Sequence, residues 1–487
     1  MNYREKTNKQ KEYGLTVKEA VAVRLSLKEC IIGEPSFYRK VAMVVIPMII
    51  QNTLSNIVGL LDNVMVGQVG TLAMSSVAIV NQLMFVFMLC VWGALAGAGI
   101  YGTQFFGKGD FEGVRITMRF KMCIAMIICT IYIAIFFIFG KSLVGLYIAS
   151  DTPVAEAERT LYLAENYLRI MLISLIPFGI TQVYAGTLRE SGKTTLPMVA
   201  SMTAMVVNFV FNLLLIFGYL GFPRLGVMGA AIATVISRFA EMGIVVVISH
   251  KNKVKYAFLT GLYNGFNIPA NMVWPILTKT LPLLANEFLW SLGQATLLQS
   301  YSVRGIEVIA AMNIANTIAQ IFNEVFLSLG NSTAIIVGQE LGADRLVNAR
   351  RASWRMATLS IVSCIVMGSL LHLVSPVIPQ IYNTEDEIRA LATSLIHVIA
   401  FCMPINSFAN VSYFTLRSGG KTLITFFFDS CFVWVVNVPA ARFLAYHTAL
   451  PVVRVYFIVC FLEIIKSMIG FILVKKGVWV RNIVKNT

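Results

Sequence analysis

Polar side chains recur at helical spacing inside a mostly apolar run that begins at Val41. Their spacings of four, four and three place them on one face of a helix. A charged side chain near the centre of a bilayer costs roughly 2.5–3.5 kcal/mol on insertion scales, so it normally faces a cavity or a partner. We therefore predict that this face points inward and that its carboxylate binds a proton or a small cation. The four residues are Gln51, Ser55, Gly59 and Asp62.

Three further apolar runs carry polar side chains in a similar way. One repeats the one-face spacing with a second carboxylate, one carries two asparagines a single turn apart, and one has several amides and an acid along one side. Carboxylate and amide oxygens suit a proton or a small hard cation, and they do not suit zinc or iron. The run with the second carboxylate carries Glu287, Ser291 and Gln294, and the run with the asparagine pair carries Asn208 and Asn212. The third run carries Asn313, Asn316, Asn323 and Glu324.

These polar residues also have purely structural explanations. Most buried asparagines in membrane bundles form hydrogen bonds between helices, and a salt bridge that only locks the packing would account for Asp62 or Glu287. Neither carboxylate has a basic residue within reach on its own helix, apart from Lys279 two turns before Glu287. Two pairs at spacing three are predicted to be internal ion pairs that keep their helices neutral. They are Arg238 with Glu241, and Glu463 with Lys466.

The composition indicates an integral membrane protein. Of 487 residues, 57% are hydrophobic and 13% are charged, and the mean hydropathy is +0.75, whereas soluble domains carry about 25% charged residues. Backbone groups in lipid must be satisfied within their own segment, and runs of this length fit helices rather than short barrel strands. We predict an all-α fold. About twelve spans are expected, starting near residues 41, 74, 120, 162, 195, 227, 276, 308, 354, 391, 422 and 455.

The formal net charge of +15 is explained by topology and does not indicate a nucleic-acid partner. Lysine and arginine gather in alternate loops, and two of the intervening loops are acidic, around residues 156 and 386. By the positive-inside rule, both termini are predicted to be cytoplasmic, as an even number of spans requires. The basic, amphipathic residues 13–33 are expected either to lie on the inner membrane surface or to form a disordered or loosely helical tail.

The two halves of the chain repeat one pattern. Six pairs of residues share an offset of 235, and TLRESGKTTL at 187–196 recurs as TLRSGGKTLI at 415–424. The repeats run in parallel, so an axis along the membrane normal is expected to relate two six-helix bundles. The predicted parts are a cytoplasmic tail (1–35), the bundles (36–249 and 276–475), a cytoplasmic linker (250–275) and a second tail (476–487). The pairs are Pro47 and Pro282, Gly70 and Gly305, Asn81 and Asn316, Gln104 and Gln339, Gly107 and Gly342, and Tyr147 and Tyr382.

A duplicated chain of twelve helices favours transport by alternating access between its halves. Other chemistry finds little support, because the four histidines are isolated in the sequence and the Gly-Lys-Thr at 192–194 lacks the upstream glycine of a phosphate-binding loop. We predict no enzyme, no cofactor and no metal beyond a transported Na⁺. The residues predicted to line the transport cavity are Gln51, Ser55, Asn81, Tyr184, Gln294, Asn316 and Glu324.

Several motifs together carry a family resemblance. They are IPMIIQN and GLLDNVMVGQVG in the first span, FFGKGD after Gln104, GTLRESGKT after the fourth span, VVNFVFNLLLIFG in the fifth, LGVMGAAIATVISR entering the sixth, and NEFLW in the seventh. Over essentially all of residues 35–480, the sequence resembles the MATE (multidrug and toxic compound extrusion) family. The resemblance implies two six-helix bundles that form a V, with efflux driven by the entry of sodium ions or protons.

The resemblance also implies roles for particular residues. Asp62, Asn208 and Asn212 correspond to the cation site of the amino half, and Glu287 corresponds to that of the carboxyl half. Sodium-coupled relatives carry a further acid eleven residues before the arginine of the second LRxxxK motif. In this chain that position is Asn406. An amide can still coordinate sodium, so the choice between H⁺ and Na⁺ stays open.

The expected function is therefore secondary antiport. The protein is predicted to export organic, cationic compounds across a bacterial cytoplasmic membrane, as a monomer surrounded by lipid, in exchange for H⁺ or Na⁺. A flippase for a lipid-linked precursor is the alternative within transport, and it would favour more spans and a strongly basic central cavity. A membrane-embedded enzyme would need clustered histidines or acids at the membrane interface.

Overall fold

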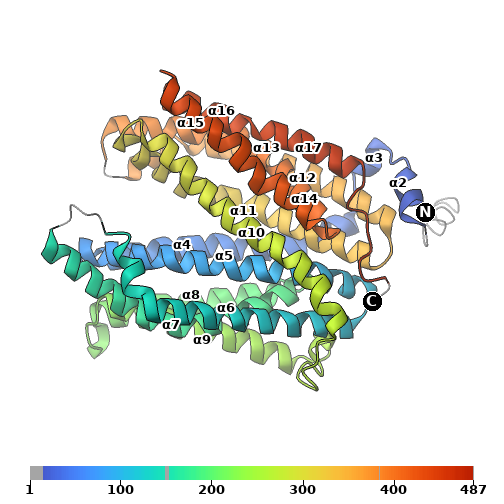
Figure 1. The fold of residues 1–487 in the computed structure, drawn as a ribbon, viewed down its shortest axis with the longest axis horizontal. Coiled ribbons are helices and arrows are strands. Elements are labelled where there is room, and N and C mark those ends of the chain that lie inside the picture. Colours follow the sequence, from blue (N-terminus) through green and yellow to red (C-terminus); the bar gives the residue numbers. More distant parts are fainter. Residues whose placement is uncertain (1–14, 149–152, 383, 486–487) are drawn as a thin grey trace. The chain divides into compact units, whose positions relative to one another are not determined.

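Long helices account for nearly all of the regular structure. The computed structural model describes residues 15–148, 153–382 and 384–485, and within them the regular elements are helices without a strand (Figure 1). This confirms the predicted all-α class. Up to the linker the elements are α2 (Val17–Ala22), α3 (Leu27–Ile31), α4 (Pro35–Gly67), α5 (Thr71–Lys108), α6 (Phe111–Gly145), α7 (Val154–Glu190), α8 (Thr195–Phe217), η1 (Tyr219–Gly221), α9 (Val227–Lys251) and η2 (Ala257–Leu259).

The second half of the chain repeats the order of the long helices, but its last two predicted spans are divided. Two π-helical turns interrupt the α-helix of the eleventh span, and the twelfth consists of α16 and α17. The elements are α10 (Ala270–Ser302), α11 (Ile306–Gly342), α12 (Leu346–Val374), η3 (Ile378–Ile381), α13 (Asp386–Ser418), α14 (Thr422–Phe426), η4 (Phe427–Cys431), η5 (Val433–Asn437), α15 (Val438–His447), α16 (Val452–Phe461) and α17 (Glu463–Lys475).

Each of the twelve predicted spans lies on a helical stretch, although one of them is more polar than the rest. Among the described residues, 11 helices are long and apolar enough to cross a membrane. The helix outside this set is α10, which is 33 residues long and carries Lys279, Asn286 and Glu287. Several spans are mostly uncovered by protein, and in α6 only 17% of the most apolar window is buried. Such a surface needs lipid around it.

The chain divides into two compact units that do not follow the order of the sequence. Unit 1 comprises Met1–Ile49, Ile100–Asp110 and Ile276–Thr487, and unit 2 comprises Ile50–Gly99 and Phe111–Pro275. In unit 2, α7 and α8 pack on α9, and α6 packs on α7. In unit 1, α11 and α12 pack on α13, which also contacts α16 and α17. The bundle boundaries at 36–249 and 276–475 stay a prediction.

Glycines at repeat-related positions have matching conformations. Gly70, before α5, and Gly305, before α11, both have positive φ angles, of 144° and 128°, which residues with a Cβ rarely adopt. Within unit 1, a Cβ on Gly107 would overlap the backbone oxygen of Gln339, and a Cβ on Gly342 would overlap that of Gln104. The end of α5 and the end of α11 therefore approach each other through reciprocal contacts.

The carboxyl-terminal segment after α17 packs against the place where the ends of α5 and α11 meet. The Gln104 side chain, which is completely buried, donates to the Ser418 carbonyl at 2.9 Å and accepts from the Ile483 backbone N–H at 2.8 Å. Trp479 and Val484 are also completely buried. The predicted tail 476–487 is thus a packed segment over the residues that the structure describes, which end at 485.

The amino-terminal segment binds to α12. Residues 1–14 of the predicted tail lie outside the described residues, and residues 15–35 form the capped short helices α2 and α3. Arg350 donates to the carbonyls of Ala20 and Val23 at 2.6 and 2.9 Å, and Arg351 forms an ion pair with Glu29. The disordered or loosely helical tail predicted for residues 13–33 is therefore wrong from residue 15 on, because arginines of α12 bind the backbone of this segment, whereas the alternative position on the membrane surface stays a prediction.

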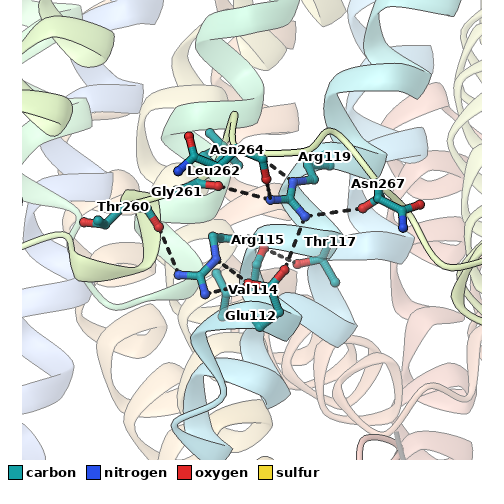
Figure 2. A network of polar contacts seen from close by, with 10 residues as sticks. All are labelled: Glu112, Val114, Arg115, Thr117, Arg119, Thr260, Gly261, Leu262, Asn264 and Asn267. Atoms are coloured by element: carbon teal, nitrogen blue, oxygen red, sulfur yellow. Dashed lines mark hydrogen bonds and ion pairs between the residues drawn. The ribbon is translucent and has the colours of Figure 1, made fainter.

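The linker between the halves is held against α6 in unit 2. Figure 2 shows Arg119 surrounded by linker carbonyls, to which it donates at 2.8 Å (Leu262), 3.1 Å (Gly261), 3.3 Å (Asn267) and 3.4 Å (Asn264). Arg119 is only 4% exposed. A buried guanidinium that bonds to backbone carbonyls fixes the path of a segment that consists mostly of turns.

Removal of this guanidinium is expected to open the linker. Each hydrogen bond to a charged group contributes about 1.5–3 kcal/mol, so Arg119→Ala should accelerate chymotrypsin cleavage after the buried Phe258 by about tenfold or more. Arg159→Ala, which removes an exposed arginine of α7, serves as the control and should leave the rate unchanged. Equal rates for the wild type and Arg119→Ala would contradict this role.

Candidate cation-binding site

Asp62 of α4 lies beside two asparagines of α8. Asn212 Nδ2 donates to Asp62 Oδ1 at 2.6 Å and to Asn208 Oδ1 at 3.1 Å. Turned by half a rotation, the Asn208 amide instead donates its own N–H groups to both Asp62 oxygens, at 2.9 and 3.3 Å. The structure thus brings together the three residues predicted for the amino half.

The two asparagines of this group are buried, and the group is rich in oxygen atoms. Asn208 and Asn212 are 5% and 1% exposed, and Asn212 Oδ1 is buried without a hydrogen-bond partner in the described chain. Thr234 of α9 accepts from Asn208 Nδ2 at 3.4 Å. A buried amide oxygen without a donor, next to a carboxylate, is a ligand set that a small cation or a protonated carboxyl group would complete.

A chain of polar contacts runs through unit 2 from α7 to α9. Arg189 donates to Gln51 Oε1 at 2.9 Å, and Gln51 Nε2 donates to Ser201 Oγ at 2.7 Å. Ser201 in turn donates to Glu241, which Arg238 binds at 3.2 Å. The predicted pair of Arg238 with Glu241 is confirmed, and it belongs to a longer chain of polar contacts.

Two residues of the polar face of α4, Gln51 and Ser55, form hydrogen bonds with other protein groups. Gln51 is 7% exposed and both atoms of its amide are bonded, as described above. Ser55 donates to the backbone oxygen of Gln51 at 2.9 Å. Ser55 is nevertheless exposed, and the cavity-lining role predicted for both residues stays a prediction.

The carboxyl half gathers more charges than the sequence predicted. Lys466 of α17 lies 2.7 Å from Asp429 and 3.4 Å from Glu463, which confirms the predicted pair of Glu463 with Lys466. Asn286, next to Glu287 in α10, donates to Asp429 at 3.1 Å. Glu287 itself is half-buried, and the charges of Arg417 and Asp429 act on it.

Asp429 is the functional candidate that the sequence analysis missed. It stands alone in the apolar stretch FFFDSCFVW, so the rule that singled out Asp62 applies to it equally. Its place within the first π-helical turn, η4, has no comparable signal in the sequence.

Asn406 and Tyr184 have surroundings that differ from those of these groups. Asn406 is half-buried, its amide oxygen has no hydrogen-bond partner, and no bond connects it to Glu287 within the described residues. Tyr184 is buried and hydrogen-bonded to His250 and Tyr263. Of the other candidates, Asn81, Gln294 and Asn316 are exposed, and Glu324 is half-buried.

The histidines are less isolated than the sequence suggested. The rings of His372 and His397 lie 4.3 Å apart between their centroids, because α12 packs on α13. Even so, no group of three or more His, Cys, Asp or Glu side chains that could hold a metal ion occurs among the residues described.

Comparisons with known proteins agree with the repeat. The family model described as MatE matches residues 47–214 and again residues 282–443. Probable multidrug resistance protein YoeA of Bacillus subtilis is 24% identical over 425 residues, which cover 87% of this chain and 90% of that protein. Probable multidrug resistance protein NorM of Thermotoga maritima is 24% identical over 426 residues, with coverages of 84% and 85%.

A solved structure shows the same fold. It is that of an outward-facing multidrug resistance MATE family transporter of the MOP superfamily, with a TM-score of 0.80 and 17% identity. The similarity covers 93% of this chain and 98% of that one.

The polar chain through Gln51 is expected to stabilise unit 2. Gln51→Leu removes the acceptor for the Arg189 guanidinium and the donor to Ser201, and an unsatisfied buried group costs about 1–3 kcal/mol. We expect a clear fall in Tm in detergent. Ser55→Ala, one turn further along α4, removes only a bond to the local backbone and should change stability by less than about 0.5 kcal/mol. Equal effects of the two substitutions on Tm would contradict a structural role for these polar contacts of Gln51.

Proposed function

We propose, on the premise that this chain belongs to the MatE family, that it is an antiporter that exports organic compounds in exchange for H⁺ or Na⁺. The multidrug resistance proteins described above support a broad range of substrates, which we expect to be organic cations. The single observation that carries the coupling role is the Asp62 carboxylate, which lies within a membrane span against two buried amides.

The geometry around Asp62 suits a site with two states. Without a cation, the amide nitrogens of Asn208 and Asn212 can both donate to the carboxylate. With a cation, the same amides can turn their oxygens toward it, because the two orientations of an amide occupy the same space. Exchange between these states requires only side-chain rotation in the amino half, and it links ion binding to the packing of α4 on α8.

Competition for negative charge then couples the ion to the substrate. An organic cation and an entering H⁺ or Na⁺ cannot both be neutralised by a single carboxylate, so the binding of one favours the release of the other. Loading of Asp62 from outside would promote discharge of the substrate, and loss of the ion to the cytoplasm would reset the site.

Glu287 is the proposed cation-binding carboxylate of the carboxyl half. Three acids lie in this region, Glu287, Asp429 and Glu463, against two bases, Lys466 and Arg417. One negative charge is thus left over in a half-buried position, which suits the attraction of an organic cation. Asn406 is assigned to this half only as an additional oxygen donor.

The alternative, a flippase for a lipid-linked precursor, is not favoured. Such a substrate carries anionic groups and would need unpaired basic side chains at mid-span. In this chain the mid-span cations Arg238 and Lys466 are each paired with a carboxylate.

The location follows from the same premise. We place the protein in the cytoplasmic membrane of a bacterium, in contact with lipid, as a monomer with both termini on the cytoplasmic side. The support is the alternation of basic and acidic loops along the chain.

Efflux measurements in proteoliposomes test the coupling. With a fluorescent organic cation as substrate and Na⁺ and pH gradients imposed separately, we expect the wild type to respond to at least one gradient. Asp62→Asn should lower gradient-driven efflux by about tenfold or more, because the amide cannot exchange an ion. The matched control is Glu165→Gln, in an ion pair of α7 with the mostly exposed Arg169, and it should behave as the wild type.

Two results would count against this proposal. Full gradient-driven efflux by Asp62→Asn would remove the coupling role of Asp62. Failure of both gradients to drive transport by the wild type would overturn the antiporter itself.

Glu287→Gln tests the substrate role. Loss of the surplus negative charge should weaken binding of a cationic dye to the detergent-solubilised protein by about tenfold, equivalent to about 1.4 kcal/mol, while the preference for H⁺ or Na⁺ stays that of the wild type. Fluorescence anisotropy of the dye measures the affinity, with Glu387→Gln at the exposed start of α13 as the control. An unchanged affinity would remove Glu287 from substrate binding.

A further inference from the structure

The carboxyl half contains a cation of its own. The Lys466 ammonium lies between the carboxylates of Asp429 and Glu463, at 2.7 and 3.4 Å. The rings of Phe428 and Phe432 flank it, with centroids at 5.7 and 6.0 Å. Lys466 is 8% exposed. Its charge is thus enclosed by two acids and two aromatic faces, an arrangement that favours any cation placed there.

Amide groups complete the shell around both acids. Asn286 of α10 donates to Asp429 Oδ2 at 3.1 Å, and Asn437 donates to Glu463 Oε1 at 2.8 Å. Asp429 and Asn437 belong to the two π-helical turns, η4 and η5. Such turns are wider than those of an α-helix, insert one residue, and occur often at functional sites.

The repeat identifies the corresponding positions in the amino half. Asn286 follows Gln51 by 235 residues, and Asp429 follows Ser201 by 228, the offsets of the repeated motifs. The amide of Gln51 bonds to Ser201, as the amide of Asn286 bonds to Asp429. Equivalent contacts thus join the first to the fifth span and the seventh to the eleventh.

The ion pairs of the sixth and twelfth spans have opposite polarity. The helices α9 and α16 begin at Val227 and Val452, an offset of 225. At this offset Arg238 corresponds to Glu463, and Glu241 corresponds to Lys466. In the amino half, the acid Glu241 contacts the neutral Ser201. At the corresponding positions of the carboxyl half, the base Lys466 contacts the acid Asp429.

The carboxylate of the amino-half site also has no counterpart. The position 235 residues after Asp62 is Leu297, which is 8% exposed. Asn437, which shares the sequence VVN with Asn208 at an offset of 229, binds Glu463. The one-residue change in offset fits the residue that a π-helical turn inserts. The carboxyl half therefore keeps the amide but uses it to hold an acid that is already paired with lysine.

We propose that Lys466 is a built-in cation that permanently occupies the acid site of the carboxyl half, so that no exchangeable ion binds between Asp429 and Glu463. The inference rests on the proposed antiport function for its consequence, which is that Asp429 and Glu463 do not carry the coupling ion. A sodium ion would have to displace a tethered ammonium, whose local concentration greatly exceeds that of the free ion. The charge inversion between the repeats thus makes the two halves unequal in ion binding.

Removal of the ammonium should create a sodium site. In an Asp62→Asn background, Lys466→Ser leaves two half-buried carboxylates, their amides and a hydroxyl oxygen. We expect NaCl, compared with choline chloride, to raise the Tm of the purified full-length protein by about 2–4 °C more than in Asp62→Asn alone. Addition of Asp429→Asn should abolish this gain. Lys475→Ser, at the exposed end of the same helix, is the matched control and should show no gain.

Two outcomes of this measurement would overturn the proposal. One is a folded Lys466→Ser protein without any additional sodium response. The other is a sodium response of Asp62→Asn that already depends on Asp429 while Lys466 is present. Because the readout is ion binding and not transport, neither result depends on whether the proposed antiport is correct.

If Lys466→Ser does not fold, a second variant tests whether Asp429 takes part in ion exchange. Asp429→Asn combined with Lys466→Met removes one negative and one positive charge, so the net charge of the cluster with Glu463 is unchanged, and it leaves no ion-exchanging carboxylate at position 429. With Asp62 intact, ion-driven efflux should stay within about threefold of the wild type. Loss of that efflux in a protein with a wild-type Tm would show that Asp429 takes part in ion exchange and would overturn the proposal.

Discussion

The need of every buried charge for a partner governs this structure. Inside a low-dielectric medium an unpaired charge is costly, and the buried cations of the described chain are held accordingly. Arg119 is surrounded by linker carbonyls, Lys121 pairs with Glu190, and Lys466 pairs with Asp429. Asp62 differs from them, because its direct contacts are two neutral amides. That difference makes Asp62 the group best suited to an exchangeable partner.

Much of the architecture could be predicted from the sequence, because hydropathy and repeats act over short distances along the chain. The spans, the duplication and the ion pairs at spacing three all follow from such local patterns. The contacts of Asp429 and the docking of α3 on α12 could not be predicted in this way. They depend on which helix faces lie together, and on a π-helical register that no residue type marks. The pair of His372 and His397 is a further example, since 25 residues separate two rings that touch.

The two halves share a backbone plan but differ in their charges. Gln51 and Asn286 make equivalent contacts, whereas Arg238 with Glu241 is matched by Glu463 with Lys466 in reversed order. Reversal preserves the neutrality of each helix, so it carries little cost in stability. It nevertheless changes which sign of charge faces the neighbouring span. A duplicated fold can acquire unequal functions in its halves by this route without any change in topology.

The burial of Gln104 has a consequence for biosynthesis. Its side chain bonds to the backbone of residues 418, 481 and 483, yet it belongs to the second long helix of the chain and is made early. The ribosome must add 379 further residues after Gln104 before its partner Ile483 exists. Until then the amide at the end of α5 lacks its final partners, so assembly of this end of unit 1 is a late event.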